Sequence, residues 1–89
     1  MITSIYDNLH AGSKALVGPN PFKSIFNVTA TENVESLTII NTNGIEVYRY
    51  GKLSQMEELK IENEFSAGLY ILTIVYSSGK VEVVRLQKL

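Results

Sequence analysis

The 89-residue sequence contains no cysteine, a single histidine and no long hydrophobic run. Without cysteine the chain has no disulfide bond, no thiolate nucleophile and no cysteine-bound metal. The only histidine, His10, lies in a polar stretch near the start, which is more typical of a solvated loop than of a catalytic site. We therefore expect no cofactor and no metal, and nothing in the sequence points to an enzyme.

A charge excess of one sign is also missing. Eight basic and nine acidic side chains are spread along the chain and leave a formal net charge of −1. Nucleic acid is not an expected partner, because phosphates require a basic stripe. No apolar run approaches the ~20 residues of a membrane helix, and residues 1–18 lack the basic and apolar regions of a secretory signal. If the domain is exported, we expect its export signal to lie further upstream.

The sequence does contain one strongly apolar stretch in its second half. In residues 69–76 every side chain except Thr73 is apolar or aromatic. Both faces of a strand formed there are apolar, so we expect it inside a sheet, with cover on at least one side. Gly68 and Tyr70 stand at its start, and a buried tyrosine hydroxyl needs a partner. This pair resembles the tyrosine corner of immunoglobulin-like sandwiches.

The rest of the chain from residue 25 alternates short apolar stretches with turns, without a helical period. Asn43-Gly44 and Ser78-Gly79 mark hairpins, because glycine readily takes the positive φ that tight turns need. The predicted strands are 25–30, 36–41, 45–50, 58–62, 69–76 and 81–89, with a seventh around 14–17. We expect the last two to pair in antiparallel fashion, because the turn between them is short.

This spacing predicts an all-β fold, an immunoglobulin-like antiparallel β-sandwich of six or seven strands. A small barrel is the competing architecture. A chain of 89 residues with 45% hydrophobic residues supports one core. Alternation along the strands places five side chains in that core, namely Phe26, Val28, Ala30, Leu37 and Ile39.

Two prolines stand close together in Gly18-Pro19-Asn20-Pro21-Phe22. Proline fixes φ near −65° and forces the residue before it toward an extended conformation. We interpret the segment as a stiff bend, which is either an elbow that separates the domain from what precedes it or a recognition element. Residues 1–16 have no clear period and are interpreted as a linker or a non-native extension.

The carboxylates do not suggest a reaction. Glu57 and Glu58 are adjacent, so on a strand they point to opposite faces and cannot act as an acid/base pair. Glu62 and Glu64 share a face, which favours a charged sheet edge over a metal site. The sequon Asn27-Val28-Thr29 is interpreted as a chance match, because it falls within a predicted strand.

Four motifs follow one another along the chain, and together they resemble one family. They are Pro19-Asn20-Pro21-Phe22, Asn43-Gly44 with the strand after it, Ala67-Gly68-Leu69-Tyr70, and Gly79 with a basic C-terminal strand. This order is similar to the C-terminal sorting domain of the type IX secretion system (the Por system) of Bacteroidetes. The resemblance covers about residues 15–89.

The resemblance implies a sorting domain over residues 17–89, attached to a cargo that reaches the periplasm by a separate N-terminal signal. Outer-membrane machinery would recognise the domain and carry the cargo across. A sortase-like peptidase would commonly remove the domain, which leaves the cargo on the cell surface or secreted. The residues that this resemblance marks for motif or recognition roles are Pro19, Asn20, Pro21, Asn43, Gly44, Gly68, Tyr70, Gly79, Arg85 and Lys88.

Other functions remain open from the residues alone. A stand-alone adhesion or carbohydrate-binding sandwich would use exposed aromatic side chains such as Tyr48 and Tyr50. Lys80, Arg85 and Lys88 near the last hairpin are either a basic docking surface or ordinary edge protection. An apolar last strand can also pair with its copy, so a homodimer through edge strands is a further alternative.

Overall fold

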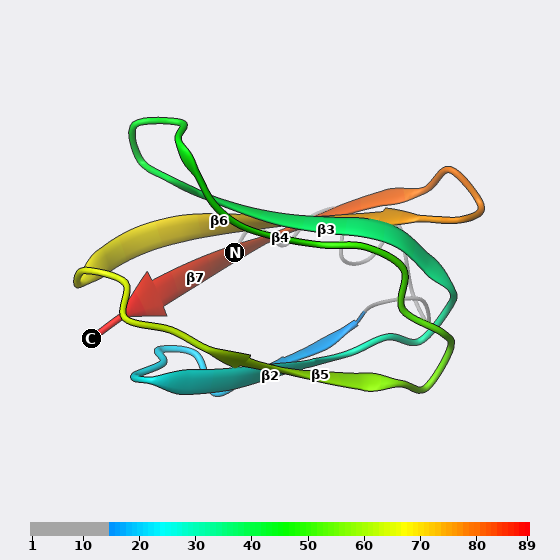
Figure 1. Ribbon diagram of the computed structural model, residues 1–89, viewed down its shortest axis with the longest axis horizontal. Coiled ribbons are helices and arrows are strands. Elements are labelled where there is room, and N and C mark those ends of the chain that lie inside the picture. The colour runs from blue at the N-terminus through cyan, green and yellow to red at the C-terminus, as the bar shows by residue number, and fades with distance from the viewer. Residues whose placement is uncertain (1–14) are drawn as a thin grey trace.

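The computed structural model describes residues 15–89, which form seven strands. These are β1 (Leu16–Gly18), β2 (Ile25–Thr29), β3 (Val34–Asn41), β4 (Glu46–Tyr50), β5 (Glu58–Glu62), β6 (Gly68–Tyr76) and β7 (Val81–Lys88). One sheet has the order β1-β2-β5 and the other β4-β3-β6-β7, and the two are stacked face to face (Figure 1). All strand pairs are antiparallel. The predicted sandwich is confirmed, and its short seventh strand is β1.

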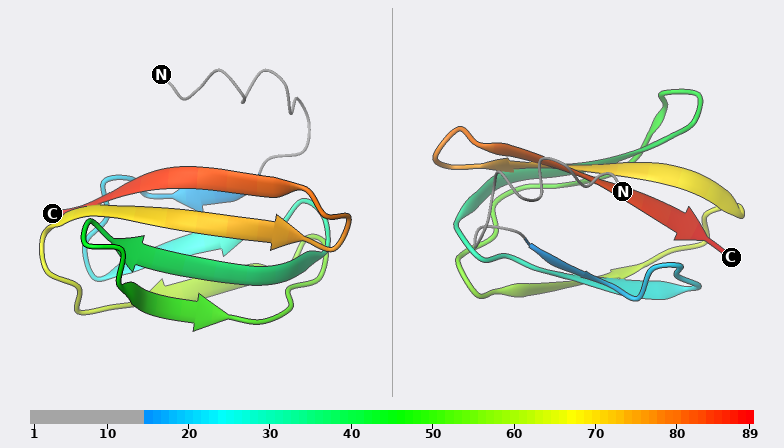
Figure 2. Two further views of the ribbon diagram at one scale, coloured as in Figure 1. Left: turned by 90° about the horizontal axis from the view of Figure 1, so that it is seen from above. Right: turned by 180° about the vertical axis from the view of Figure 1, so that it is seen from behind.

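β6 lies in the interior of the larger sheet, as its sequence predicted. β3 pairs with it on one side and β7 on the other (Figure 2). Its inward side chains are buried, namely Tyr70, Leu72, Ile74 and Tyr76, whereas Leu69 on the outward face is exposed. The second sheet therefore covers only one of the two apolar faces of β6.

The core fills the space between the sheets. Its side chains come from alternate positions of the long strands, because an extended strand turns every second residue to the same face. The five residues predicted to point inward are all buried, namely Phe26, Val28, Ala30, Leu37 and Ile39. Burial of one such side chain contributes about 1.5–3 kcal/mol, so the core holds the two sheets together. The edge strands β1 and β4 add half-buried side chains such as Val17 and Tyr48.

Three loops carry the chain from one sheet to the other. The first connects β2 to β3, the second, residues 51–57, connects β4 to β5, and the third, residues 63–67, connects β5 to β6. Within the second loop Leu53 is buried, and its backbone exchanges hydrogen bonds of 2.8 and 3.1 Å with Val34. Because Val34 also pairs with Tyr76, β3 begins two residues before the strand predicted at residue 36.

Both predicted hairpins are present, and each contains a glycine with positive φ. Gly44 (φ 80°) lies in the β3–β4 turn and Gly79 (φ 95°) in the β6–β7 turn. In Asn43-Gly44 only the glycine takes positive φ. The Asn41 side chain stabilises this turn, since its Oδ1 accepts from the amides of Asn43 (2.9 Å) and Ile45 (3.0 Å).

Replacing Gly79 with alanine is expected to lower the free energy of unfolding by about 1–2 kcal/mol, because an L-residue is strained at this φ. No atom lies within 4 Å of the added Cβ, so the loss is conformational rather than steric. Gly51→Ala is the matched control, because Gly51 is equally open and lies outside the left-handed region. It should be neutral or stabilise by about 0.4–1 kcal/mol. Equal urea unfolding curves for the two variants would contradict this prediction.

Candidate functional site: the seam between the two ends of the domain

The segment Pro19-Asn20-Pro21-Phe22 follows β1 and lies along the outer edge of β7. The Asn20 side chain donates from Nδ2 to the carbonyl oxygen of Arg85 (2.8 Å), and its Oδ1 accepts from the amide of Gln87 (3.0 Å). Both prolyl peptide bonds are cis. One asparagine therefore satisfies two backbone groups that the edge of a sheet otherwise leaves to water.

Phe22 extends this contact with both its backbone and its ring. Its amide donates to the carbonyl of Gln87 (2.8 Å), and its carbonyl accepts from the amide of Leu89 (2.9 Å). The two segments run parallel here, with Phe22 beside Lys88. The ring is fully buried, with its centroid 4.6 Å from that of Phe26. The proline-rich segment is thus anchored in the core as well as on β7.

Ala15, the first described residue, is tied to β7 by a buried carboxylate. Glu82 of β7 points between the sheets, and its Oε1 accepts from the amide of Ala15 (3.1 Å) and from the Tyr76 hydroxyl. A buried charge is tolerated only where hydrogen bonds replace the lost water. Burial, and then the hydrogen bond to Glu82, raise the pKa of Tyr76 well above its ordinary value.

We call the contacts of residues 15–22 with residues 82–89 the terminal seam. They follow the same order along both segments, from Ala15 with Glu82 to Phe22 with Leu89. Figure 2 shows β1 and β7 on the same side of the sandwich, one in each sheet. The seam therefore joins the two sheets at one edge, and each end of the described chain is a partner of the other.

The start of β6 is fixed by the tyrosine corner expected from the sequence. The Tyr70 hydroxyl donates to the carbonyl of Ser66 (2.6 Å), and the Phe65 ring stacks on Tyr70 at 5.0 Å. Gly68 has φ 144°, a conformation that favours glycine. Since Tyr70 is buried, its contacts are with the domain itself.

The three basic residues near the last hairpin do not lie on one face. Lys80 forms an ion pair with Glu32 (2.7 Å), and the Lys88 ammonium donates to Asn63 (2.8 Å). Lys88 also lies over the Phe22 ring, 5.7 Å from its centroid. Arg85 points outward from β7 and is exposed. A common basic surface of the three side chains is therefore not formed.

Tyr48 and Tyr50 do not form an outward aromatic platform. Tyr48 pairs with Ile39 of β3, and Tyr50 pairs with Leu37. Because both partners are buried, the two tyrosines on the edge strand β4 face the sandwich interior. Tyr48 packs partly against the core, and burial raises the pKa of its hydroxyl. This arrangement gives no support to the adhesion or carbohydrate-binding alternative.

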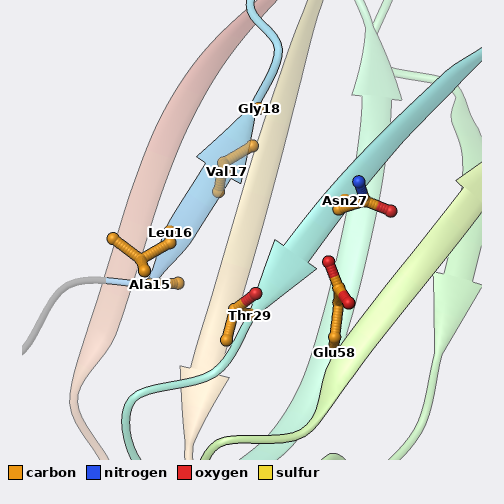
Figure 3. Close-up of a pocket in the computed structure, with 7 residues that line it drawn as sticks. All are labelled: Ala15, Leu16, Val17, Gly18, Asn27, Thr29 and Glu58. Atoms are coloured by element: carbon orange, nitrogen blue, oxygen red, sulfur yellow. The ribbon is translucent and has the colours of Figure 1, made fainter.

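An open depression lies outside the three-stranded sheet. Figure 3 shows Asn27 and Thr29 on β2, with β1 on one side and Glu58 of β5 on the other. Glu58 is the single ionisable residue among those that line it, so no acid/base pair is assembled there. Within residues 15–89 no three histidine, aspartate or glutamate side chains converge, and no helix could span a membrane. His10 lies outside these residues.

Sequence reasoning missed the buried pair of Tyr76 and Glu82. A partial signal was present, because Tyr76 shares its parity with Leu72 and Ile74 and so brings a hydroxyl into the core. Glu82 gave no such signal. It stands between two valines, and a charged side chain in a strand is expected to face solvent. The register of β7 against β6, with Glu82 opposite Ile74, turns it inward.

The described residues define an antiparallel β-sandwich whose first and last segments are joined along one edge. The chain belongs to the family described as secretion system C-terminal sorting domain, whose profile matches residues 17–86. The domain is therefore a C-terminal sorting signal of the type IX secretion system. This function entails contact with the secretion machinery, an attached cargo, and export toward the outer membrane and the cell surface or beyond.

Two further comparisons accompany this assignment. No curated protein matches the chain. Among solved structures, CopC from Methylosinus trichosporium OB3b is similar, with 15% sequence identity and a TM-score of 0.48. The alignment covers 84% of this chain and 91% of the CopC chain.

Asn20→Ala is expected to lower the free energy of unfolding by about 1–3 kcal/mol, because two hydrogen bonds of about 0.5–1.5 kcal/mol each are lost. The amide of Gln87 should also exchange its hydrogen faster. Asn43→Ala is the matched control, because the Asn43 side chain is exposed and has no hydrogen bond within the described residues. If both variants unfold at the same urea concentration, the Asn20 contacts do not stabilise the seam.

Stability should fall at alkaline pH because of Tyr76. Its pKa in the folded state is raised above the ordinary value near 10, so the fold favours the neutral hydroxyl. This contribution is complete below about pH 10 and is lost as the pH rises through the folded-state pKa, by up to ~1.4 kcal/mol per pH unit. Urea unfolding at several alkaline pH values should show that the free energy of unfolding falls less steeply with pH in Tyr76→Phe than in the unchanged protein. Some decrease of the unfolding free energy with pH should remain in Tyr76→Phe, because the pKa of Tyr48 is also raised. An identical pH dependence in both proteins would rule out this role of Tyr76.

Proposed function

We propose that the folded domain acts as a handle that the outer-membrane machinery grips while it carries the attached cargo out of the periplasm. A sortase-like peptidase then removes the domain, and the cargo stays on the surface or is released. The domain performs no reaction itself. The observation that carries the proposal is the family match over residues 17–86, which extends from β1 into β7.

The terminal seam supports recognition of the assembled sandwich rather than of a linear peptide. The side chain of Asn20 uses both its polar groups on β7, and Tyr70 is buried with its hydroxyl on Ser66. Gly44 and Gly79 provide positive φ in turns. Most of the residues that mark the family resemblance therefore build the shape of the domain, which leaves recognition to its outer faces.

In this proposal the peptidase cuts upstream of Ala15. Proteolysis requires an exposed, extended segment, whereas Ala15 is buried and its amide is bonded to Glu82. A cut before Ala15 separates the cargo while all seven strands stay together.

Deleting residues 80–89 from a cargo fusion tests the proposed function. The deletion removes β7 and with it one side of the seam, so surface display of the cargo should fall to the background of a strain without the secretion system. The same fusion carrying Thr42→Ala, which alters an exposed turn residue outside the family motifs, should be displayed normally. Undiminished display of the truncated fusion would refute the proposal.

A further inference from the structure

The outer face of the four-stranded sheet carries an apolar patch over β6 and β7. The residues that pair across these strands on this face are Leu69 with Gln87, Ile71 with Arg85, Thr73 with Val83, and Val75 with Val81. They alternate with the inward pairs that form the core, so their side chains point away from the second sheet. Ile40 of β3 lies opposite Ile71 and extends the patch.

The patch is exposed, and the equivalent face of the other sheet is more polar, with Leu16 and Ile25 as its exposed apolar residues. Leu69, Val81 and Val83 have 44%, 48% and 41% of their surface exposed. Outside the three-stranded sheet the paired residues are mostly polar or charged, namely Asn27 with Lys60, Thr29 with Glu58, and Ile25 with Glu62. An antiparallel sheet with one solvated face normally places polar residues there, so the face formed by β6 and β7 departs from that pattern.

Arg85 is the single charged side chain among the outward pairs of β6 and β7. It lies opposite Ile71 and is flanked along β7 by Val83 and Gln87. Within the described residues its guanidinium has no hydrogen bond or ion pair, whereas its carbonyl is bonded to Asn20. A guanidinium that becomes covered among aliphatic side chains requires a carboxylate partner, because an unpaired buried charge is costly.

We propose that this patch, comprising Leu69, Ile71, Val75, Val81, Val83 and Arg85, is the docking face for a protein segment of the secretion machinery. That segment presents an apolar surface with a carboxylate opposite Arg85. The inference rests on the proposed function and adds the face of the domain that the machinery binds. Charge complementarity supports it, because arginine is enriched at the centres of protein interfaces and the surrounding aliphatic side chains would exclude water from its ion pair.

A membrane surface fits the patch less well. Each basic residue near an anionic membrane contributes only about 1 kcal/mol, and the patch has a single arginine in a chain with a net charge of −1. The face also lacks tryptophan and tyrosine, the residues that membrane interfaces favour. A protein partner therefore accounts better for one charge set among aliphatic side chains.

The test measures export of a cargo fusion whose domain carries changes only on this face. Arg85→Glu reverses the charge, and the double variant Val81→Thr/Val83→Thr keeps the branched shape and strand preference of valine while making the surface polar. We expect each to reduce the exported fraction at least about tenfold, the effect of ~1.4 kcal/mol of lost binding. Arg85→Lys should retain part of the export.

The matched control is Leu16→Thr/Ile25→Thr, which alters two exposed residues of the opposite sheet. Its export should equal that of the unchanged fusion. Urea unfolding of the 89-residue chain should be similar for all variants, because the altered side chains are exposed. An export loss that follows a loss of stability, or that the control shares, would overturn the docking face.

The outcomes separate this inference from the proposed function. If the unchanged fusion is exported and the patch variants are exported equally well, the docking face is wrong and the proposed function stands. If the unchanged fusion is not exported in a strain with the system, both fail. Two further measurements on the isolated chain also count against a machinery partner. They are a dimer in sedimentation that Arg85→Glu abolishes, and binding to anionic phospholipid vesicles that the same change abolishes.

Discussion

The arrangement of the two sheets depends on one constraint, which is that the unpaired outer edge of β7 has to be covered. An edge strand of eight residues presents unpaired backbone groups to solvent and to other chains. Here the segment before β2 covers part of that edge, through the Asn20 side chain and the Phe22 backbone. Because the Phe22 ring is also buried between the sheets, the same segment protects the edge of β7 and closes the core.

This coupling explains why the family resemblance lies in turns and in the proline segment rather than in a set of reactive groups. Asn20 and Phe22 attach the start of the domain to its end, and Gly79 allows the hairpin that brings β7 back along β6. Each residue determines where a strand lies. Under the proposed function, the receptor recognises the folded domain through the side chains that its outer faces expose.

Local features of the fold were predictable from the sequence, and contacts between distant residues were not. The apolar run of β6, the two glycine turns and the Tyr70 corner depend on neighbours within about ten residues, so pattern and turn chemistry were sufficient. Asn20 and Gln87 lie far apart in the chain, and no periodicity links an asparagine amide to the backbone of a remote strand. The buried position of Glu82 likewise depends on the β6–β7 register, which the sequence of β7 alone leaves open. The charges of Lys80 and Lys88 suggested a surface, but each has an internal partner.

The parallel order of the terminal seam has a mechanical consequence. Under the proposed function, a cargo that trails behind the domain would pull on the chain at Ala15, while a receptor that held the far end of β7 would resist. In this geometry the tension runs along both segments, so the hydrogen bonds from Ala15 to Phe22 are loaded together in shear instead of being opened one after another. The traction of transport would therefore be borne by the seam, through its hydrogen bonds and through the buried ring of Phe22.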